Sequence, residues 1–245
     1  MPSDVHRASP LPQRAWIMRQ TWHDLLFAHY RVGARVLREL VPACLELQTF
    51  DGAAWIGVVP FRMSGVRLRG MPPLPGAAAF PELNLRTYVA HDGRPGVYFF
   101  ALEARSRLAV EAARAWFGLP YHHAAMSCTP RDDDVVYASR RTDRRGAPAR
   151  FEATYGPRGH VSHARAGSLE HWLTERYCLY SVSKRGVLLR GDIHHEPWPL
   201  QSAAAEIAVD TLPSAHGIEI DTSPPLLHFA RRLDVWLWAP RSASA

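Results

Sequence analysis

Short runs of apolar and aromatic residues, separated by turn signals, occupy most of this chain. Asp51-Gly52 lies between two such runs, and this dipeptide is a strong hairpin signal because both residues tolerate positive φ. Residues 82–90 alternate apolar with polar side chains, which predicts a strand with one apolar and one polar face. The pattern predicts roughly ten to twelve strands, most of them joined by hairpins. They are expected near residues 16–19, 25–32, 45–50, 53–63, 82–90, 97–102, 121–128, 135–141, 149–156, 177–182, 187–195 and 226–238.

Helical spacing of apolar residues occurs at only a few places. Residues 34–41 and 168–176 fit short helices, and residues 106–117 form the clearest one, with an apolar stripe that includes Leu108 and Trp116. Gly118 follows the last helix position, as expected for a C-cap. There is no alternation of strand and helix, which argues against a parallel Rossmann-type sheet. The pattern favours a mainly β protein, an antiparallel barrel or curved sandwich with two or three short helices.

The organisation predicted is a flexible N-terminal tail over residues 1–13 followed by one domain over residues 14–240. No internal repeat or low-complexity linker divides that stretch. Hydrophobic residues make up 47% of the 245 residues and charged residues 21%, which excludes whole-chain disorder. No run of about 18 apolar residues occurs, so a membrane partner is not expected. No secretory signal precedes the domain, which favours the cytoplasm.

The chain is basic, with a net charge of +6, but its charge is dispersed. Only one of the 29 basic residues is a lysine, Lys184, so the rest are arginines. The one tight cluster, RTDRRGAP at residues 141–148, is predicted to be a solvated hairpin loop, and a nucleic-acid partner is not expected. The three cysteines are odd in number and widely spaced, which favours buried thiols over a disulfide framework or a CxxC site.

Sequence motifs for the common cofactors and metals are missing. There is no HExxH, GxSxG, GxGxxG or P-loop pattern, so no metal and no cofactor is expected. The chain has 13 histidines, two pairs of them adjacent: His122-His123 and His194-His195. Because neighbours on a strand point to opposite faces, each pair is expected to place one imidazole inward and one outward.

What remains is a set of polar residues on otherwise apolar strands. Barrels often bind a small molecule in the mouth or lumen, where a few polar groups fix its orientation. An arginine suits a carboxylate because it can donate two parallel N–H bonds. Surface ion pairs are the competing interpretation, and Glu82 and Arg86 in particular could pair with each other. The residues concerned are Arg31, Glu82, Arg86, Tyr121, His122, His123, Arg190, His194 and His195.

Five strings in order resemble a family of uncharacterised bacterial proteins, DUF2071, related to the acetoacetate decarboxylase superfamily. They are TWHDLLFAHYRV, LELQTFDGAAWIGVVPFRMSGVR, FPELNLRTYV, FGLPYHHA and LLRGDIHHEPWPLQ. The resemblance runs from about residue 14 to residue 240. It implies a largely antiparallel β cone or barrel around a buried pocket, in agreement with the predicted hairpins.

The resemblance also assigns residues to that pocket. Tyr30-Arg31 through Val41-Pro42 looks like the decarboxylase segment whose arginine lines the pocket, so Arg31 is implied to bind substrate. Pro120-Tyr121-His122 looks like the segment that carries a proline and two lysines. The Schiff-base lysine would therefore fall at Tyr121, which cannot form an imine. Glu82 is a looser match to a glutamate near the pocket.

Two hypotheses follow for function. The first is an enzyme without a covalent lysine that acts on a small carboxylate or carbonyl compound. Arg31 would hold the carboxylate, with Arg86, Arg190 and His194 as further binding groups. An acid/base set would come from Tyr121, His122, His123 and Glu82. The second is a non-catalytic small-molecule-binding protein with the same cavity. Both leave open a homo-oligomer.

Overall fold

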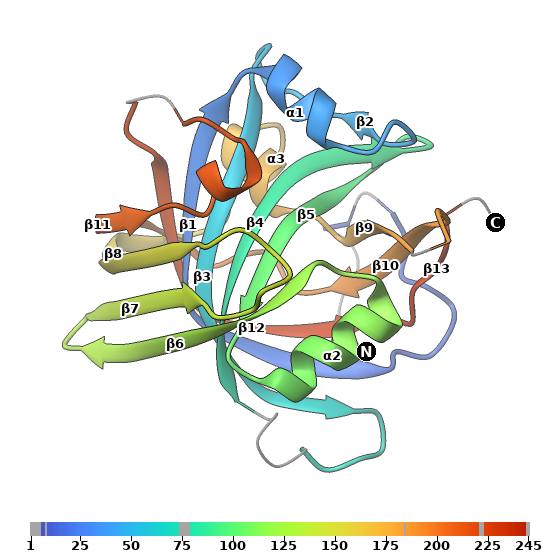
Figure 1. Ribbon diagram of the computed structural model, residues 1–245, viewed down its shortest axis with the longest axis horizontal. Helices are drawn as coiled ribbons and strands as arrows, with labels where there is room; N and C mark the ends of the chain where they lie inside the picture. The colour runs from blue at the N-terminus through green and yellow to red at the C-terminus, as the bar shows by residue number, and fades with distance from the viewer. Residues whose placement is uncertain (1–5, 8, 74–78, 184, 221–222, 244–245) are drawn as a thin grey trace.

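The computed structural model describes residues 6–7, 9–73, 79–183, 185–220 and 223–243, and strands make up most of it (Figure 1). The predicted mainly β fold is confirmed. The helices are α1 (Ala34–Leu40), α2 (Arg107–Phe117) and α3 (Leu169–Thr174), with one 3₁₀ turn at Ser214–His216. The strands are β1 (Met18–Val32), β2 (Glu46–Leu47), β3 (Ala54–Leu68), β4 (Phe80–His91), β5 (Arg94–Ala104), β6 (Tyr121–Arg131), β7 (Asp134–Arg141), β8 (Arg150–Ser162), β9 (Cys178–Val182), β10 (Leu188–His194), β11 (Leu200–Asp210), β12 (Leu226–Leu237) and β13 (Arg241–Ser242).

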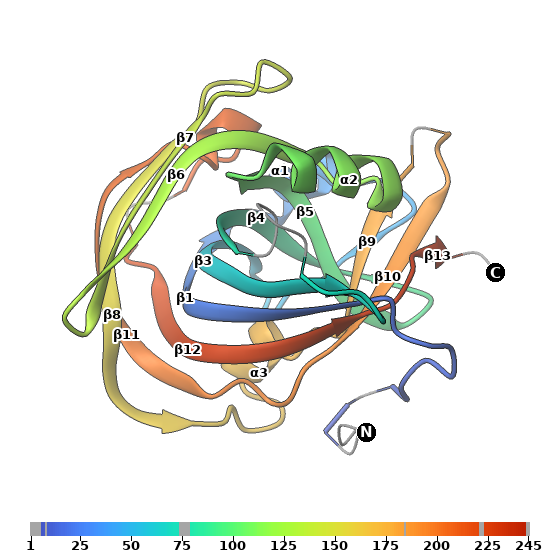
Figure 2. The same cartoon turned by 90° about the horizontal axis from the view of Figure 1, so that it is seen from below.

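The strands form one branched sheet in which β5 and β12 are the branch points. β5 pairs with β4, β6 and β9, and β12 pairs with β1, β10 and β11. The pairings therefore close two circuits that share β12, β1, β3, β4 and β5. The larger circuit continues through β6, β7, β8 and β11, and the smaller one through β9 and β10. Figure 2 shows β6, β7, β8 and β11 curving around the outside while β3 and β4 lie near the middle.

The sheet is mixed rather than wholly antiparallel. β5 pairs in parallel with β6 and with β9, and the other pairings are antiparallel. Parallel neighbours cannot be joined by a hairpin and need a longer crossover. Helix α2 is that crossover between β5 and β6. The Ser106 side chain accepts a hydrogen bond from the Ala109 backbone N–H, and Gly118 ends the helix at φ 61°.

Two apolar cores lie on opposite faces of the shared strands. Leu25 and Phe27 of β1 belong to one core, together with residues of β9, β10 and α2. Leu26 and Ala28 belong to the other, together with residues of β6, β7 and β8. We call these the small-circuit core and the large-circuit core. Because both faces are covered, strand β1 is a continuous apolar run at residues 25–28.

Three local predictions need correction. The strands predicted at residues 16–19 and 25–32 are replaced by one long strand, β1, which begins at Met18 and has a positive φ of 52° at Asp24. Strand β11 was not predicted. The predicted stripe of α2 packs only in part: Phe117 is buried and Ala109 packs against the core, whereas Leu108 is 74% and Trp116 59% exposed.

Other local predictions agree with the structure. The Asp51-Gly52 turn has φ values of 48° and 75°, as its hairpin role requires. The three cysteines are free, although only Cys178 is buried. Lys184 and part of the predicted loop at 71–76 lie outside the described residues. No helix in the described part of the chain is long and apolar enough to cross a membrane. The boundary between a tail and a domain at residue 14 stays a prediction.

Candidate functional site

A row of buried polar side chains lies on one face of β4. Glu82, Asn84, Arg86 and Tyr88 share that face because they are two residues apart on a strand. All four are buried, and Tyr88 belongs to the small-circuit core. We call these four residues the polar stripe. The alternation predicted for residues 82–90 is confirmed, but the polar face points into the protein instead of to solvent.

Glu82 and Tyr121 form the closest pair among the residues predicted to act in catalysis. The Tyr121 hydroxyl donates to Glu82 Oε2 at 2.8 Å, from the first residue of β6. Burial raises the pKa of Glu82 to about 8, although hydrogen bonds from Tyr121 and Asn84 act in the opposite direction. Burial also raises the pKa of Tyr121, and the nearby Glu82 adds to that rise. A carboxyl group that titrates near pH 8 can hold or release a proton under physiological conditions.

Two guanidinium groups lie buried near the other end of the polar stripe. Arg86 Nη2 donates to the Leu173 carbonyl at a long 3.4 Å, and Arg86 Nε has no hydrogen-bond partner among the described residues. Arg176 donates to the Trp172 carbonyl and to Gln48, while its Nη2 also lacks a partner there.

Both cations lie against the same aromatic ring, since the Cζ atoms of Arg86 and Arg176 are 5.7 and 5.2 Å from the Tyr88 ring centroid. Neither forms an ion pair with a carboxylate of the described chain. Burial lowers the pKa of Arg176 to about 10, so the group remains a cation at neutral pH. The interior at this end of the stripe therefore holds positive charge that no carboxylate of the described residues compensates.

A neutral histidine of β1 lies next to the polar stripe. The Tyr88 hydroxyl and His29 Nε2 are 2.7 Å apart, and His29 is completely buried against Phe27. Burial lowers the pKa of His29 well below its ordinary value, and Arg86 lowers it further. Gly57 gives this pair its space: a Cβ there would lie 3.2 Å from the His29 ring and 3.3 Å from the Tyr88 hydroxyl.

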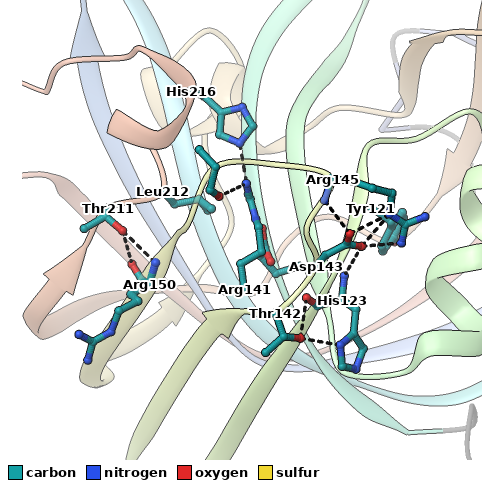
Figure 3. Close-up of polar contacts among 12 residues, drawn as sticks. Tyr121, His123, Arg141, Thr142, Asp143, Arg145, Arg150, Thr211, Leu212 and His216 are labelled. Atoms are coloured by element: carbon teal, nitrogen blue, oxygen red, sulfur yellow. Dashed lines mark hydrogen bonds and ion pairs between the residues drawn. The ribbon is translucent and has the colours of Figure 1, made fainter.

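The other predicted acid/base residues lie elsewhere. His122 points to the opposite face of β6 from Tyr121, where burial lowers its pKa to about 4. His123 bonds through Nδ1 to the Thr142 hydroxyl at 2.7 Å. Figure 3 shows the contact between His123 and Thr142 beside Arg141, whose guanidinium lies 3.3 Å from His216 Nε2. His122 and His123 therefore do not join the Glu82–Tyr121 pair.

The predicted substrate-binding residues are divided among three places. Arg86 is on the polar stripe. Arg31 is exposed at the end of β1, with its guanidinium 5.8 Å from the Trp55 ring centroid. Arg190 and His194 lie on β10 together with Asp192, on the face opposite to Ile193 of the small-circuit core. Glu82 and Arg86 do not form an ion pair with each other, since Glu82 bonds Tyr121 and Arg86 bonds Leu173.

Two expectations about charged and titratable residues are wrong. His194 and His195 are both buried, because the chain around the end of β10 is covered on both sides. The arginine cluster at 141–148 is only partly solvated: Arg141 is buried and donates through Nε and Nη2 to Glu103 Oε1. Within the described residues, no group of three or more histidine, cysteine or acidic side chains could hold a metal.

Sequence reasoning missed Asn84, Tyr88, His29 and Arg176 as members of the site. Asn84 and Tyr88 alternate with leucine and valine in β4, as solvent-facing residues of a strand would. They differ from such residues only in being buried, and the alternation does not reveal that both faces of β4 are buried. His29 lies in an apolar run, and a single polar residue in such a run indicates a buried polar group. Arg176 follows a short helix, and nothing in the local sequence distinguishes it from a solvated C-terminal arginine.

Two surface depressions of about 670 and 330 Å³ lie away from this set. Asp133 and Arg158 line both of them, near the turn between β6 and β7 and along β8. No residue of the polar stripe lines either depression. They are open, shallow features bordered by ordinary surface ion pairs such as Arg158 with Asp134.

Comparison with known sequences establishes the family. The model of DUF2071, described as an uncharacterized conserved protein, matches residues 19–234. This chain belongs to the DUF2071 family. A relative from Bacillus subtilis (strain 168), "Uncharacterized protein YqjF", is 50% identical over 234 residues, which is 96% of each chain. The resemblance predicted from the five sequence strings is confirmed.

Solved structures with a similar fold include acetoacetate decarboxylases and a biosynthetic enzyme. Acetoacetate decarboxylase from Legionella pneumophila has a TM-score of 0.65 at 12% identity, covering 98% of this chain and 93% of that one. The enduracididine biosynthesis enzyme MppR, solved with pyruvate, has a TM-score of 0.65 at 14% identity, covering 97% and 93%. At these identities the similarity shows a shared acetoacetate decarboxylase-like fold for the DUF2071 protein.

Proposed function

We propose that this DUF2071 protein binds a small carboxylate compound with a carbonyl group along the polar stripe and exchanges protons with it. The observation that carries the proposal is the pair of buried guanidinium groups, Arg86 and Arg176, that no carboxylate of the described chain neutralises. A carboxylate ligand would supply the missing charge and accept the unused Arg86 Nε–H donor.

The polar stripe has separate groups for binding and for proton transfer. Arg86 and Glu82 are four residues apart on β4, which corresponds to about 13 Å along an extended strand. Asn84 lies between them, and its Oδ1 has no hydrogen-bond partner among the described residues. A ligand whose carboxylate meets Arg86 would direct its carbonyl toward the Glu82–Tyr121 pair, and Asn84 Oδ1 could accept a hydrogen bond from the O–H of its enol form.

The chemistry supported by this arrangement is general acid/base catalysis. The Tyr121 hydroxyl can donate to a carbonyl oxygen as negative charge develops on it, while Glu82 in its ionised form accepts the proton from the adjacent carbon. Such donation stabilises the enol or enolate formed when a proton leaves the adjacent carbon. A lysine imine is not part of this proposal, because tyrosine occupies the position that the family resemblance assigns to the Schiff-base lysine.

The similar structures support the class of ligand. MppR has been solved with pyruvate, and acetoacetate decarboxylase is named for a keto acid. Pyruvate is therefore the first probe. Calorimetric titration is expected to show saturable binding to the wild-type protein and about 10- to 100-fold weaker binding to Arg86→Gln, because a charge-assisted hydrogen bond is lost. Arg67→Gln, on the exposed end of β3, is the matched control and is expected to bind as wild type.

Proton exchange separates an enzyme from a non-catalytic binding protein. In D₂O, the wild-type protein is expected to accelerate deuterium incorporation into the methyl group of pyruvate, measured by NMR. Tyr121→Phe is expected to keep pyruvate binding within about threefold and to lose most of this acceleration. Binding that is unchanged in Arg86→Gln would refute the assigned carboxylate site. Binding without any exchange would leave the binding function and refute the catalytic one.

A further inference from the structure

A second group of arginines surrounds one buried carboxylate on the face of β10 that carries Leu188, which packs in a third, smaller apolar cluster. Asp192 is 1% exposed, and three guanidinium groups reach it: Arg14 Nη2 at 3.3 Å, Arg94 Nη2 at 3.1 Å and Arg190 Nε at 3.2 Å. We call these four residues the Asp192 cluster. One carboxylate therefore faces three cations, and two positive charges are left uncompensated.

Most N–H donors of the Asp192 cluster lack an aligned hydrogen-bond acceptor. Among the described residues, only Arg14 makes a hydrogen bond to the carboxylate, through Asp192 Oδ2. Arg94 and Arg190 approach Asp192 Oδ1 closely, yet that oxygen has no aligned hydrogen-bond donor. Arg190 Nε and Nη2 are fully shielded from solvent and lack hydrogen-bond partners within the described residues. Buried guanidinium donors without acceptors are costly, which indicates an unfilled acceptor position.

A further arginine joins the Asp192 cluster from the N-terminal segment. Arg7 is buried against the Tyr177 ring, 4.3 Å from Cζ to the centroid, and donates to the Ile193 carbonyl. Its Nη2 has no partner among the described residues. Burial lowers the pKa of Arg7, and repulsion from Arg94 contributes in the same direction.

Neighbouring strands add to the positive charge. Arg241 of β13 lies directly opposite Arg190 in the β10–β13 pairing, and like charges placed opposite each other are unfavourable. Figure 2 shows β13 and the N-terminal segment on the same side of the molecule as β10. The side chains of Arg14 and Arg94 are 34% and 23% exposed, so the Asp192 cluster can be reached from solvent.

We propose that the Asp192 cluster, with Arg7, is a binding site for a doubly charged oxyanion, phosphate or a small phosphate monoester. A dianion would balance the two positive charges that Asp192 leaves, and its oxygens would accept the unused donors of Arg190, Arg94 and Arg7. The site is separate from the polar stripe, because Asp192 and Arg190 point away from the small-circuit core. It does not depend on the proposed function.

The test is calorimetric titration of the full-length protein with inorganic phosphate at about pH 8, where phosphate is a dianion, with chloride used to keep ionic strength constant. We expect saturable binding that is weakened about tenfold or more in Arg190→Gln and in Arg94→Gln. Arg35→Gln, whose side chain is 94% exposed on α1, is the matched control and should bind phosphate as wild type. Glycerol phosphate, titrated in parallel, distinguishes a monoester ligand from the free ion by which of the two binds more tightly.

Three outcomes would overturn the site. They are no saturable binding of either phosphate compound, binding unchanged in both arginine variants, and acetate binding as tightly as phosphate. Arg94 is partly exposed, so Arg94→Gln is expected to fold. If Arg190→Gln does not fold, phosphate binding by Arg94→Gln alone tests the site. Pyruvate binding should be unchanged in Arg94→Gln, so failure of this site and failure of the polar stripe give different results.

Discussion

At the scale of single residues, the buried carboxyl of Glu82 makes stability depend on pH. Its pKa of about 8 in the folded protein is above the ordinary value of 4.5. The folded state therefore binds more protons than the unfolded state between these two pH values. The stabilising contribution of the protonated carboxyl is complete below about pH 4.5 and is lost as pH rises through about 8.

Glu82→Gln should remove this pH dependence, because glutamine keeps the size and polarity of the side chain but does not ionise. We expect the free energy of unfolding of the wild-type protein to fall by on the order of 2 kcal/mol more than that of Glu82→Gln between pH 6 and pH 9. Urea unfolding at the two pH values measures the difference. Parallel pH dependences for the two proteins would show that Glu82 is not the group that titrates.

The buried ion pair between Glu103 and Arg141 gives a second prediction at this scale. Both side chains are 1% exposed, and one Glu103 oxygen accepts two bonds from the guanidinium. Glu103→Gln is expected to reduce the free energy of unfolding by about 3–5 kcal/mol, since it leaves an uncompensated buried charge. Glu111→Gln, which removes an exposed partner of Arg145, is the matched control and should have little effect. Similar losses for the two variants would contradict the assignment.

At the scale of elements, the branch of the sheet at β5 depends on a glycine. Gly96 lies beside β9, where a Cβ would be 2.7 Å from Cys178 Sγ and 2.8 Å from the Cys178 carbonyl oxygen. Only a residue without a side chain allows β9 to pair with β5 at this point, because part of the contact is with backbone that cannot rotate away. The branch is what closes the small circuit around the polar stripe.

Gly96→Ala should therefore destabilise the protein by about 1–3 kcal/mol, as overpacking in a core does. Gly33→Ala is a suitable control, because its nearest neighbour would be 3.9 Å away and its φ of −59° suits any residue. Chemical denaturation of both variants measures the effect. If Gly96→Ala is as stable as Gly33→Ala, β9 is not held against β5 as described.

The strands also show which features the sequence predicts and which it does not. The alternation at residues 82–90 predicted β4 correctly, but the same alternation fits a strand whose polar face is in water. Strand β11 is rich in alanine, which has little preference for strands, so it was not predicted although its burial alternates regularly. Arg141 was predicted to be solvated because its partner, Glu103, is 38 residues away in the chain.

At the scale of the whole molecule, the two circuits share strands that carry the functional residues. The faces of β1, β3 and β4 divide the interior into two cores, and His29 and the polar stripe lie on the face of the small-circuit core. Such shared strands couple the packing of the two cores, since neither face can loosen without moving the other. We therefore expect one cooperative unfolding transition instead of separate melting of the two circuits.

Adjacent residues of β1 provide the test of this coupling. Phe27→Ala removes a side chain from the small-circuit core and Leu26→Ala one from the large-circuit core, and both are fully buried. Each is expected to cost about 2–5 kcal/mol.

The small-circuit core contains Trp55 and Trp198, whereas the large-circuit core contains no tryptophan among its described members. Tryptophan fluorescence therefore reports mainly on one core and far-UV circular dichroism on the whole sheet. For Leu26→Ala we expect the midpoints from both signals to fall together. If circular dichroism changes while the fluorescence midpoint stays at its wild-type value, the two circuits unfold independently and the polar stripe is not stabilised by the larger one.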